Sequence, residues 1–257
     1  MVNLPKIYII CGSLFAFGVI ENLFVFYHTK TSYLQKIRSN YTLAFINAIS
    51  INSMFIFLLT WITTKPVFSG IIPLCIPNPH IQFLISFLLL DFFMYTWHRL
   101  MHEVPWGWKF HQVHHSELNL NTSSSFRFHS IEIFTSKILQ LGWIWLLGID
   151  LEFYFFYEII FIVIVLFQHS NIAVPFCLDK IMSYVIVTPN FHRIHHSQNG
   201  YEANSNYSSV LSLWDFVFRT FKWHKNPLLI QIGMVEYPQQ KNTLQLLKMP
   251  FTKKKGR

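Results

Sequence analysis

Cysteine and charge are both scarce in this chain, and each shortage narrows what the protein can be. Three cysteines, Cys11, Cys75 and Cys177, stand far apart and form no C-x-x-C pair, so neither a disulfide framework nor a sulfur-ligated metal site is indicated. Charged residues make up 12% of the 257 residues, against about 25% in an ordinary soluble domain. Glycine-rich phosphate loops, G-x-S-x-G elbows, internal repeats and aromatic-basic nucleic-acid modules are also missing. We therefore expect no nucleic-acid partner.

Apolar residues take the place of the missing charges, at 52% of the chain. Three apolar runs approach the roughly 20 residues that a helix needs to cross a bilayer. Two further runs are shorter and carry Lys137, Glu152 and Glu158, so they are either a spanning pair or a hairpin that only enters the bilayer. The five runs are 7–27, 41–61, 81–97, 134–148 and 151–168. The predicted fold class is all-α, a polytopic membrane helical bundle of about four to five hydrophobic helices.

Histidine is plentiful, and eight of the 13 histidines fall in three clusters. On a helix, residues three or four apart share a face, so H-x-x-x-H and H-x-x-H each direct two imidazoles at one point. An adjacent pair diverges by about a third of a turn, so its members can serve two neighbouring metals. Because a tetrahedral site takes about four ligands, eight histidines predict a dinuclear centre. The clusters are His98 and His102, then His111, His114 and His115, then His192, His195 and His196.

Two histidines outside the clusters are also of interest. His169 ends the last apolar run, where it could reach the centre as a ninth ligand. A structural or supporting role is the expectation for His129.

The approach to the first cluster carries polar residues on one helical stripe. Asp91, Tyr95, His98 and His102 are spaced 4, 3 and 4 apart, which places them on a single face. A ligating histidine usually gives its second ring N–H to a carboxylate or carbonyl, so Asp91 is a candidate partner. The alternative is that Asp91 marks the membrane edge or pairs with a basic residue. Tyr95, His129 and Asn171 are further candidates for contacts that support the ligands.

Basic residues suggest the orientation in the membrane. The segment after the first run holds Lys30, Lys36 and Arg38, whereas 63–80 holds only Lys65, so the first loop is expected to be cytoplasmic. Counting crossings then places all three clusters on the cytoplasmic face, as a histidine-rich cap with two metals. The basic tail at 253–257 falls on the same side. The net charge of +8 is therefore explained by topology and anionic headgroups.

The order H-x-x-x-H, H-x-x-H-H and H-x-x-H-H, with apolar runs between, resembles the fatty acid hydroxylase and sterol desaturase superfamily of membrane di-iron enzymes. Similar blocks extend over roughly 81–220 and include Asn206-Tyr207. The His102-Glu103-Val104 pattern resembles alkylglycerol monooxygenase-like and bacterial sterol desaturase-like members. Where the family commonly has glycine, this chain has Ser208 and Arg219. Neither is a ligand, so the departure concerns local loop geometry.

The resemblance implies two iron ions (Fe²⁺/Fe³⁺), dioxygen as co-substrate, and hydroxylation or desaturation of a lipid drawn from the bilayer. Spacing alone does not select iron, because imidazole also binds zinc, copper and nickel. No redox domain is recognisable in the sequence, so a separate electron donor of the cytochrome b5, ferredoxin or pterin type is expected. The alternative is a histidine-rich metal-binding or transport protein without oxygenase activity. A transporter should place ionisable groups along a path through the bilayer, whereas here the ligands gather on one face.

A single membrane domain is expected to account for the chain. Its parts are N-terminal helices at 1–79, a catalytic region at 80–225 and a basic tail at 226–257. The terminal K-K-x-x pattern at 254–257 has the form of an endoplasmic-reticulum retrieval signal. A bacterial origin would instead place the protein in the inner membrane.

Overall fold

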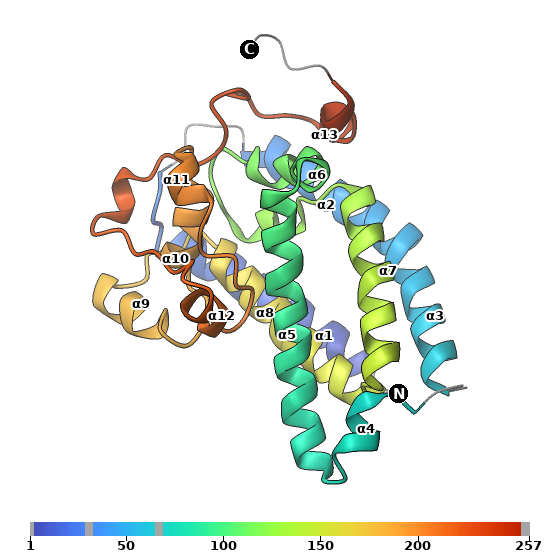
Figure 1. Ribbon diagram of the computed structural model, residues 1–257. Coiled ribbons are helices and arrows are strands. Elements are labelled where there is room, and N and C mark those ends of the chain that lie inside the picture. The colour runs from blue at the N-terminus through green and yellow to red at the C-terminus, as the bar shows by residue number, and fades with distance from the viewer. Residues whose placement is uncertain (1–2, 29–32, 65–68, 253–257) are drawn as a thin grey trace.

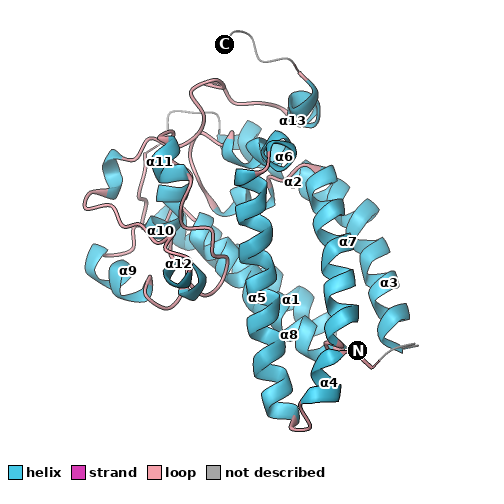
Figure 2. Ribbon diagram, in the orientation of Figure 1, coloured by secondary structure: helices cyan, strands magenta, loops and turns pink. Residues whose placement is uncertain are grey.

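The structure, a computed structural model, describes residues 3–28, 33–64 and 69–252. Within these ranges every regular element is a helix, and strand pairing is limited to three isolated bridges (Figure 2). The predicted all-α fold class is confirmed. The basic tail at 253–257, Lys30 and Lys65 lie outside the described residues.

Long helices form the body of the molecule (Figure 1). They pack with α1 against α8, α5 against α8, and α3 against α7. The second helix runs on through a π-helical turn into the third without a break. Their bounds are α1 (Asn3–Leu23), α2 (Tyr33–Asn47), η1 (Ala48–Asn52), α3 (Ser53–Thr64), α5 (Pro79–Glu103), α7 (Ser130–Leu147) and α8 (Leu151–His169).

Short helices and loops other than α4 gather at one end of this body, above and beside the upper part of α5 in Figure 1, whereas α4 lies at the opposite end, beside the lower part of α5. Among them, α6 contacts α5, and α10 contacts the end of α8. Their bounds are α4 (Ile71–Cys75), α6 (Pro105–His115), η2 (Thr122–Phe126), α9 (Phe176–Met182), α10 (Pro189–His195), α11 (Gly200–Ala203), α12 (Leu213–Val217), η3 (Pro227–Leu229), α13 (Thr243–Lys248) and η4 (Met249–Phe251).

Three helices in the described chain are long and apolar enough to span a membrane: Leu34–Thr64, Pro79–Glu103 and Leu151–His169. The first is longer than the predicted run 41–61, and it takes in Lys36 and Arg38, which we expected in a loop. The apolar part of α1, Ile7–Leu23, is a shorter helix. Of the two shorter runs predicted from the sequence, α8 qualifies as a span and α7 is not among the three.

The spanning helices expose large apolar side chains outward. Phe57 and Trp61 on α3, Leu84 on α5 and Phe156 on α8 are all well exposed. In water such a surface would be a liability, whereas lipid tails solvate it at no cost. The protein is therefore a membrane protein, as the composition predicts.

A tightly packed core joins α3, α5, α7 and α8. Leu59, Leu90, Ile144 and Tyr154 are almost completely buried in it. Between helices in a bilayer, the hydrophobic effect gives little drive, so van der Waals packing and specific contacts hold the bundle. This core fixes the relative positions of the helices that carry the site.

Proline and glycine set the junction between α5 and α6. Helix α5 ends at Glu103 because Val104 precedes Pro105, and a residue before proline avoids the helical region. Helix α6 then begins on Pro105, which needs no N–H partner at that position. A Cβ on Gly107 would lie 2.7 Å from Met101 Cα, so only glycine permits this close crossing. The junction folds the second histidine cluster back against the first.

A left-handed glycine closes the turn between α7 and α8. Gly148 has φ 69° and is followed by Asp150, whose side chain accepts a hydrogen bond from Glu152 N over 2.7 Å and caps α8. A Cβ on Gly70 would lie 2.1 Å from Gly148 Cα, so two glycine backbones meet here. The turn sends α8 back to the end of the bundle where α6 lies.

Candidate metal centre

All eight cluster histidines and His169 come together at one end of the bundle, in two neighbouring groups. Within each group, one ring nitrogen from every member lies within 4.8 Å of the others. The first group is His98, His102, His111, His115 and His195, and the second is His114, His169, His192 and His196. The structure thus brings together every residue that the sequence offered as a ligand, including the ninth.

The adjacent histidine pairs are divided between the two groups. His114 and His115 belong to different groups and have ring planes 84° apart, and the same holds for His195 and His196, at 89°. Neighbouring residues on a helix project about 100° apart, so this division follows from the local helical geometry. Each pair therefore links the two groups through one stretch of backbone.

Backbone carbonyls fix the ring orientation in the first group. The Nδ1 of His98 lies 2.8 Å from Tyr207 O, and the Nδ1 of His195 lies 2.7 Å from Ser205 O. A carbonyl oxygen can only accept, so each Nδ1 carries the proton and each Nε2 keeps a lone pair. Two rings are thus held in the tautomer that a metal needs.

A carboxylate fixes a third ring. The Nδ1 of His111 donates to Glu132 Oε1 over 2.7 Å, and both side chains are buried. Each member of the first group has a buried Nε2 with no hydrogen-bond partner in the described chain: His98, His102, His111, His115 and His195. Unpartnered buried polar atoms are costly, and a metal ion would satisfy these five Nε2 atoms.

In the second group the Nε2 atoms form a chain of close contacts. His169 Nε2 lies 3.1 Å from the Nε2 of both His114 and His192, and His192 Nε2 lies 3.1 Å from His196 Nε2. Ligands bonded to one ion at about 2.1 Å lie about 3.0–3.4 Å apart by simple geometry. The Nδ1 of His169 donates to Val165 O over 2.8 Å, which leaves its Nε2 unprotonated. The donor set therefore fits a second metal ion.

Burial keeps five of the histidines outside the spanning helices neutral. It lowers the pKa of His114, His115, His192, His195 and His196 well below the ordinary value of 6.5, and the neighbouring imidazoles lower it further. Metal binding to histidine requires the neutral ring. At physiological pH these five rings are thus in their ligating form.

Arg193, within the third cluster, joins that cluster to the end of α8. It is completely buried, and its Nη2 donates to Ser170 O and Ile172 O, each over 3.0 Å. Its guanidinium lies 3.8 Å from the centre of the Phe26 ring. These contacts hold His192 beside His169.

Asp91 and Tyr95 do not contact a histidine of the clusters through the hydrogen bonds described. Asp91 accepts from Trp214 Nε1 over 2.9 Å and from Leu211 N over 3.1 Å. Tyr95 OH lies 3.0 Å from Thr220 Oγ1. Both residues instead hold the segment that follows Tyr207 against α5, so their effect on the ligands is indirect.

His129 and Asn171 also serve the scaffold. His129 caps α7 by accepting from Ile131 N over 3.1 Å, and its other nitrogen lies 3.1 Å from Leu247 O. The Asn171 side chain accepts a hydrogen bond from Tyr27 N and donates one to Tyr27 O, each over 3.0 Å. Neither side chain belongs to the two histidine groups.

Sequence reasoning missed Glu132 and the place of Tyr207. The ring of Tyr207 packs on His102 and His195, with centroids 5.2 and 5.7 Å apart. Glu132 is a carboxylate in the first turn of an apolar helix, and acidic residues at such positions are usually functional. Its position in the sequence could therefore have marked it as a candidate. The packing of Tyr207 had no local signal, because it depends on the fold.

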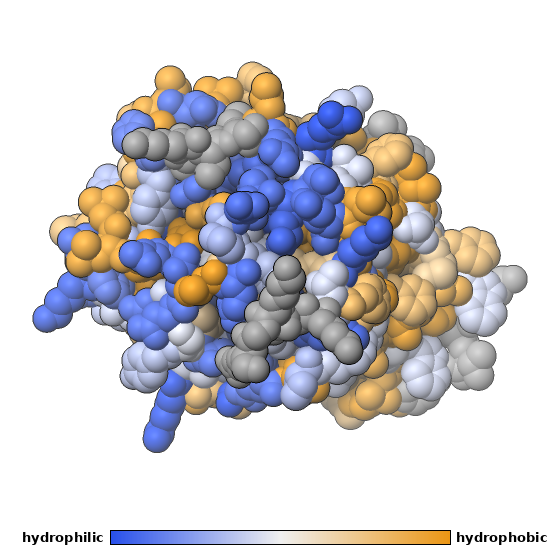
Figure 3. Space-filling model, turned by 90° about the horizontal axis from the view of Figure 1, so that it is seen from above, coloured by the Kyte–Doolittle hydropathy of each residue, from blue (hydrophilic) through white to orange (hydrophobic). Residues whose placement is uncertain are grey.

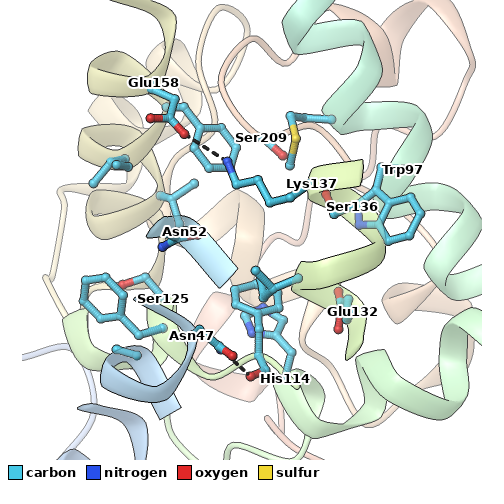
Figure 4. Close-up of a pocket in the computed structure, with 18 of the residues that line it drawn as sticks. Asn47, Asn52, Trp97, His114, Ser125, Glu132, Ser136, Lys137, Glu158 and Ser209 are labelled. Carbon is cyan, nitrogen blue, oxygen red and sulfur yellow. Dashed lines mark hydrogen bonds and ion pairs between the residues drawn. The ribbon is translucent and has the colours of Figure 1, made fainter. Parts of the chain in front are cut away.

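A cavity of about 460 Å³ runs between the hydrophobic helices and ends on the histidines (Figure 4). Its walls are mostly apolar and come mainly from α1, α2, η1, α3, α5, α7 and α8. Where it meets the cluster it is lined by His98, His111, His114, His169 and His192. Seen from the end where α13 lies, hydrophilic side chains gather over the middle of the surface and apolar ones toward the sides (Figure 3).

Comparison with known proteins finds relatives that are named as hydroxylases or monooxygenases. Ornithine lipid hydroxylase OlsE of Rhizobium tropici is 33% identical over 176 residues, covering 67% of this chain and 51% of the relative. Human alkylglycerol monooxygenase is 32% identical over 144 residues, covering 53% of this chain and 30% of the relative. Fatty acid hydroxylase vlmA of a Lecanicillium species is 26% identical over 160 residues, covering 57% and 44%. This chain thus spans between about a third and a half of these relatives. No solved structure matches it.

The model of the fatty acid hydroxylase family matches residues 83–220. That stretch is more than half of the chain, and it contains all three histidine clusters and His169. It also contains Glu132 and Tyr207, which contact histidine rings of the first group. The chain therefore belongs to the fatty acid hydroxylase family.

Proposed function

We propose that this protein is a membrane-bound di-iron oxygenase that hydroxylates or desaturates a lipid, using dioxygen and electrons from a separate donor. The observation that carries the proposal is that the apolar cavity is continuous with the histidine groups. An apolar cavity between the hydrophobic helices ends directly on two groups of imidazoles whose ring nitrogens converge. An alkyl chain entering from the bilayer would meet the metal centre without passing through water.

The two histidine groups would each hold one iron ion. Imidazole does not by itself select iron over zinc or copper, so the choice of iron rests on family membership. Two bound ferrous ions would supply the electrons and the binding site with which dioxygen is activated for cleavage of an unactivated C–H bond. The names of the relatives, which include an alkylglycerol monooxygenase and an ornithine lipid hydroxylase, favour hydroxylation of a lipid.

The chain's own side chains would position and protect this chemistry. Glu132 and the carbonyls of Ser205 and Tyr207 hold three rings in the ligating tautomer, which preorganises the site. The apolar walls of the cavity exclude water, and so protect a reactive centre from side reactions. They would also hold the chain so that one carbon lies against the histidines.

We place the centre on the cytoplasmic side, at the membrane surface. This assignment rests on the basic residues Lys36 and Arg38 near one end of the first span, since such residues favour the cytoplasm. Electrons would arrive from the aqueous side, from a donor of the cytochrome b5, ferredoxin or pterin type. The membrane would be the endoplasmic reticulum in a eukaryote or the inner membrane in a bacterium.

Lipidomics of cells expressing the wild type and His195→Ala tests the proposal. An oxidised lipid should accumulate only with the wild type, and purified wild type should hold about two iron ions per chain, one for each histidine group. His80→Ala is the matched control, because His80 is an exposed histidine at the opposite end of α5. An unchanged product in His195→Ala cells, or metal uptake into vesicles without oxygen consumption, would overturn the proposal.

A further inference from the structure

The cavity that ends on the histidines has an ion pair in its wall. Lys137 on α7 and Glu158 on α8 both line it, and Lys137 Nζ lies 3.0 Å from Glu158 Oε1 (Figure 4). Gln140 lines the same wall and accepts from Lys137 Nζ over 3.1 Å. A cavity for a plain alkyl chain would need none of these groups.

The pair lies at mid-height in its helices, well away from the metal centre. Lys137 and Glu158 are each near the middle of helices of 18 and 19 residues. Glu158 precedes His169 by 11 residues, which is about 16 Å along α8 at 1.5 Å per residue. Charged groups at such a depth are costly in a bilayer and usually serve a function.

The pair is held rigidly from behind and remains accessible from the cavity side. Lys137 Nζ also contacts Tyr154 OH at 3.3 Å, and Tyr154 OH donates to Glu158 Oε1 over 2.5 Å. Tyr154 is only 1% exposed, whereas the side chains of Lys137 and Glu158 keep 20% and 16% of their surface accessible. Because Lys137 Nζ already donates to Glu158, Gln140 and Tyr154, the network presents a charge-balanced polar wall to whatever fills the cavity.

A third helix adds a polar group to the lining. Asn52 ends the π-helical turn η1, lines the cavity, and has a buried Oδ1 with no hydrogen-bond partner in the described chain. In Figure 4 its side chain lies between the level of the Lys137–Glu158 pair and that of His114. Single π-helical turns in α-helices occur frequently at functional sites. Here the π-helical turn η1 contributes Ala48 and Asn52 to the lining of the cavity.

We propose that Lys137, Glu158, Gln140 and Asn52 bind a neutral hydrogen-bonding group, a hydroxyl or an amide, on the buried part of the lipid that occupies the cavity. The polar group is neutral because the two charges already cancel, and a further charge would remain unpaired in a low-dielectric site. The site would set the distance between this group and the carbon held at the histidines. The inference rests on the proposed function only in taking that lipid to be the substrate.

Binding of matched probes tests the site without any oxidation step. Native mass spectrometry of the full chain in detergent micelles, with 1-hexadecanol and hexadecane in competition, reports the preference for a hydroxyl. The wild type should favour 1-hexadecanol by about tenfold, as expected for one or two hydrogen bonds. Lys137→Met/Glu158→Gln should reduce the preference to about threefold, the share that Asn52 contributes, and leave hexadecane binding unchanged. Palmitate and hexadecylamine should bind more weakly than the alcohol.

Asn52→Leu provides a second variant that leaves the ion pair intact. It should reduce the preference about threefold even if the double variant fails to fold. Thr60→Val is the matched control, since Thr60 lies on the exposed side of the same long helix and its hydroxyl donates to Ile56 O of its own helix. An undiminished preference in both cavity variants, no preference in the wild type, or tighter binding of a charged probe would overturn the assignment. Because no reductant is present, a lack of oxygenase activity would not affect these outcomes.

Discussion

His111 Nδ1 donates to Glu132 Oε1 over 2.7 Å, and both side chains are at most 3% exposed. The contact joins α6, which carries the second histidine cluster, to the first turn of α7. It fixes the ring in the tautomer whose Nε2 faces the other members of the first group. One hydrogen bond thus couples the packing of two helices to the chemistry of the centre.

Glu132→Ala should weaken metal binding in the first group by about 10–100-fold, the usual effect of losing a carboxylate behind a ligating histidine. Competition with a calibrated chelator measures the affinity. Glu152→Gln, at the exposed start of α8, is the control and should bind metal as the wild type does. Equal affinity in Glu132→Ala and wild type would show that the contact does not support a ligand.

His169 and His129 both lie outside the three clusters, and their alanine variants distinguish the proposed ligand, His169, from the helix cap, His129. His169→Ala removes one of four nitrogens from the second group, so the metal content should fall from about two ions toward one per chain. His129→Ala should leave the metal content unchanged and destabilise α7 by about 1 kcal/mol through loss of its cap. Elemental analysis and thermal unfolding distinguish the two. Full metal content in His169→Ala would contradict its assignment to the centre.

Arg219→Gly should stabilise the protein. Arg219 is exposed and has φ 58°, a left-handed conformation that costs most residues about 1–2 kcal/mol. Glycine removes that cost but has a more flexible unfolded state, so a net gain of about 0.5–1 kcal/mol is expected in unfolding experiments.

Asn206→Gly is the contrasting variant, because Asn206 has a similar φ of 55°. Its side chain bonds Phe191 O, Lys222 O and Lys222 N at 2.7–3.0 Å. This variant should therefore lose about 2 kcal/mol despite the relief of strain. Stabilisation of Asn206→Gly, or destabilisation of Arg219→Gly, would contradict the explanation.

Asp179→Asn should stabilise the protein near neutral pH only. Burial raises the pKa of Asp179 from 3.8 to about 6, against the opposing effects of Asn190 and Arg193. Because the folded pKa is above the unfolded one, ionisation destabilises the fold as the pH rises through about 6, and the effect is absent below about pH 4. The variant stays neutral and should gain up to about 2–3 kcal/mol at pH 7.5. Thermal unfolding of both proteins at several pH values measures the difference. A gain in stability that is the same at every pH would show that ionisation of Asp179 is not its cause.

Local sequence patterns predicted most of the centre. The three- and four-residue spacings of the clusters fix which rings share a helical face, whatever the rest of the fold does. The apolar runs predicted the spanning helices for the same reason, since length and hydropathy are local properties. Lys36 and Arg38 were misplaced in a loop, because the helix that contains them begins at Tyr33 and its polar first turns carry no hydropathy signal.

Partners far apart in the chain could not be predicted in this way. Asp91 shares a stripe with His98, yet its two shortest hydrogen bonds come from Leu211 and Trp214, about 120 residues away. Nothing in the spacing of α5 distinguishes a histidine partner from a loop partner. Glu132 supports His111 only because α6 and α7 meet at their ends.

By itself the sequence determined that this is a helical membrane protein with a histidine-rich centre, because hydropathy and helical periodicity act within one segment. Only the tertiary structure decided how nine histidines divide into two groups, and that His169 joins the second. It also decided that a cavity with an ion pair in its wall leads to them. These features depend on how distant helices pack, and close packing is a property of all the side chains at an interface together.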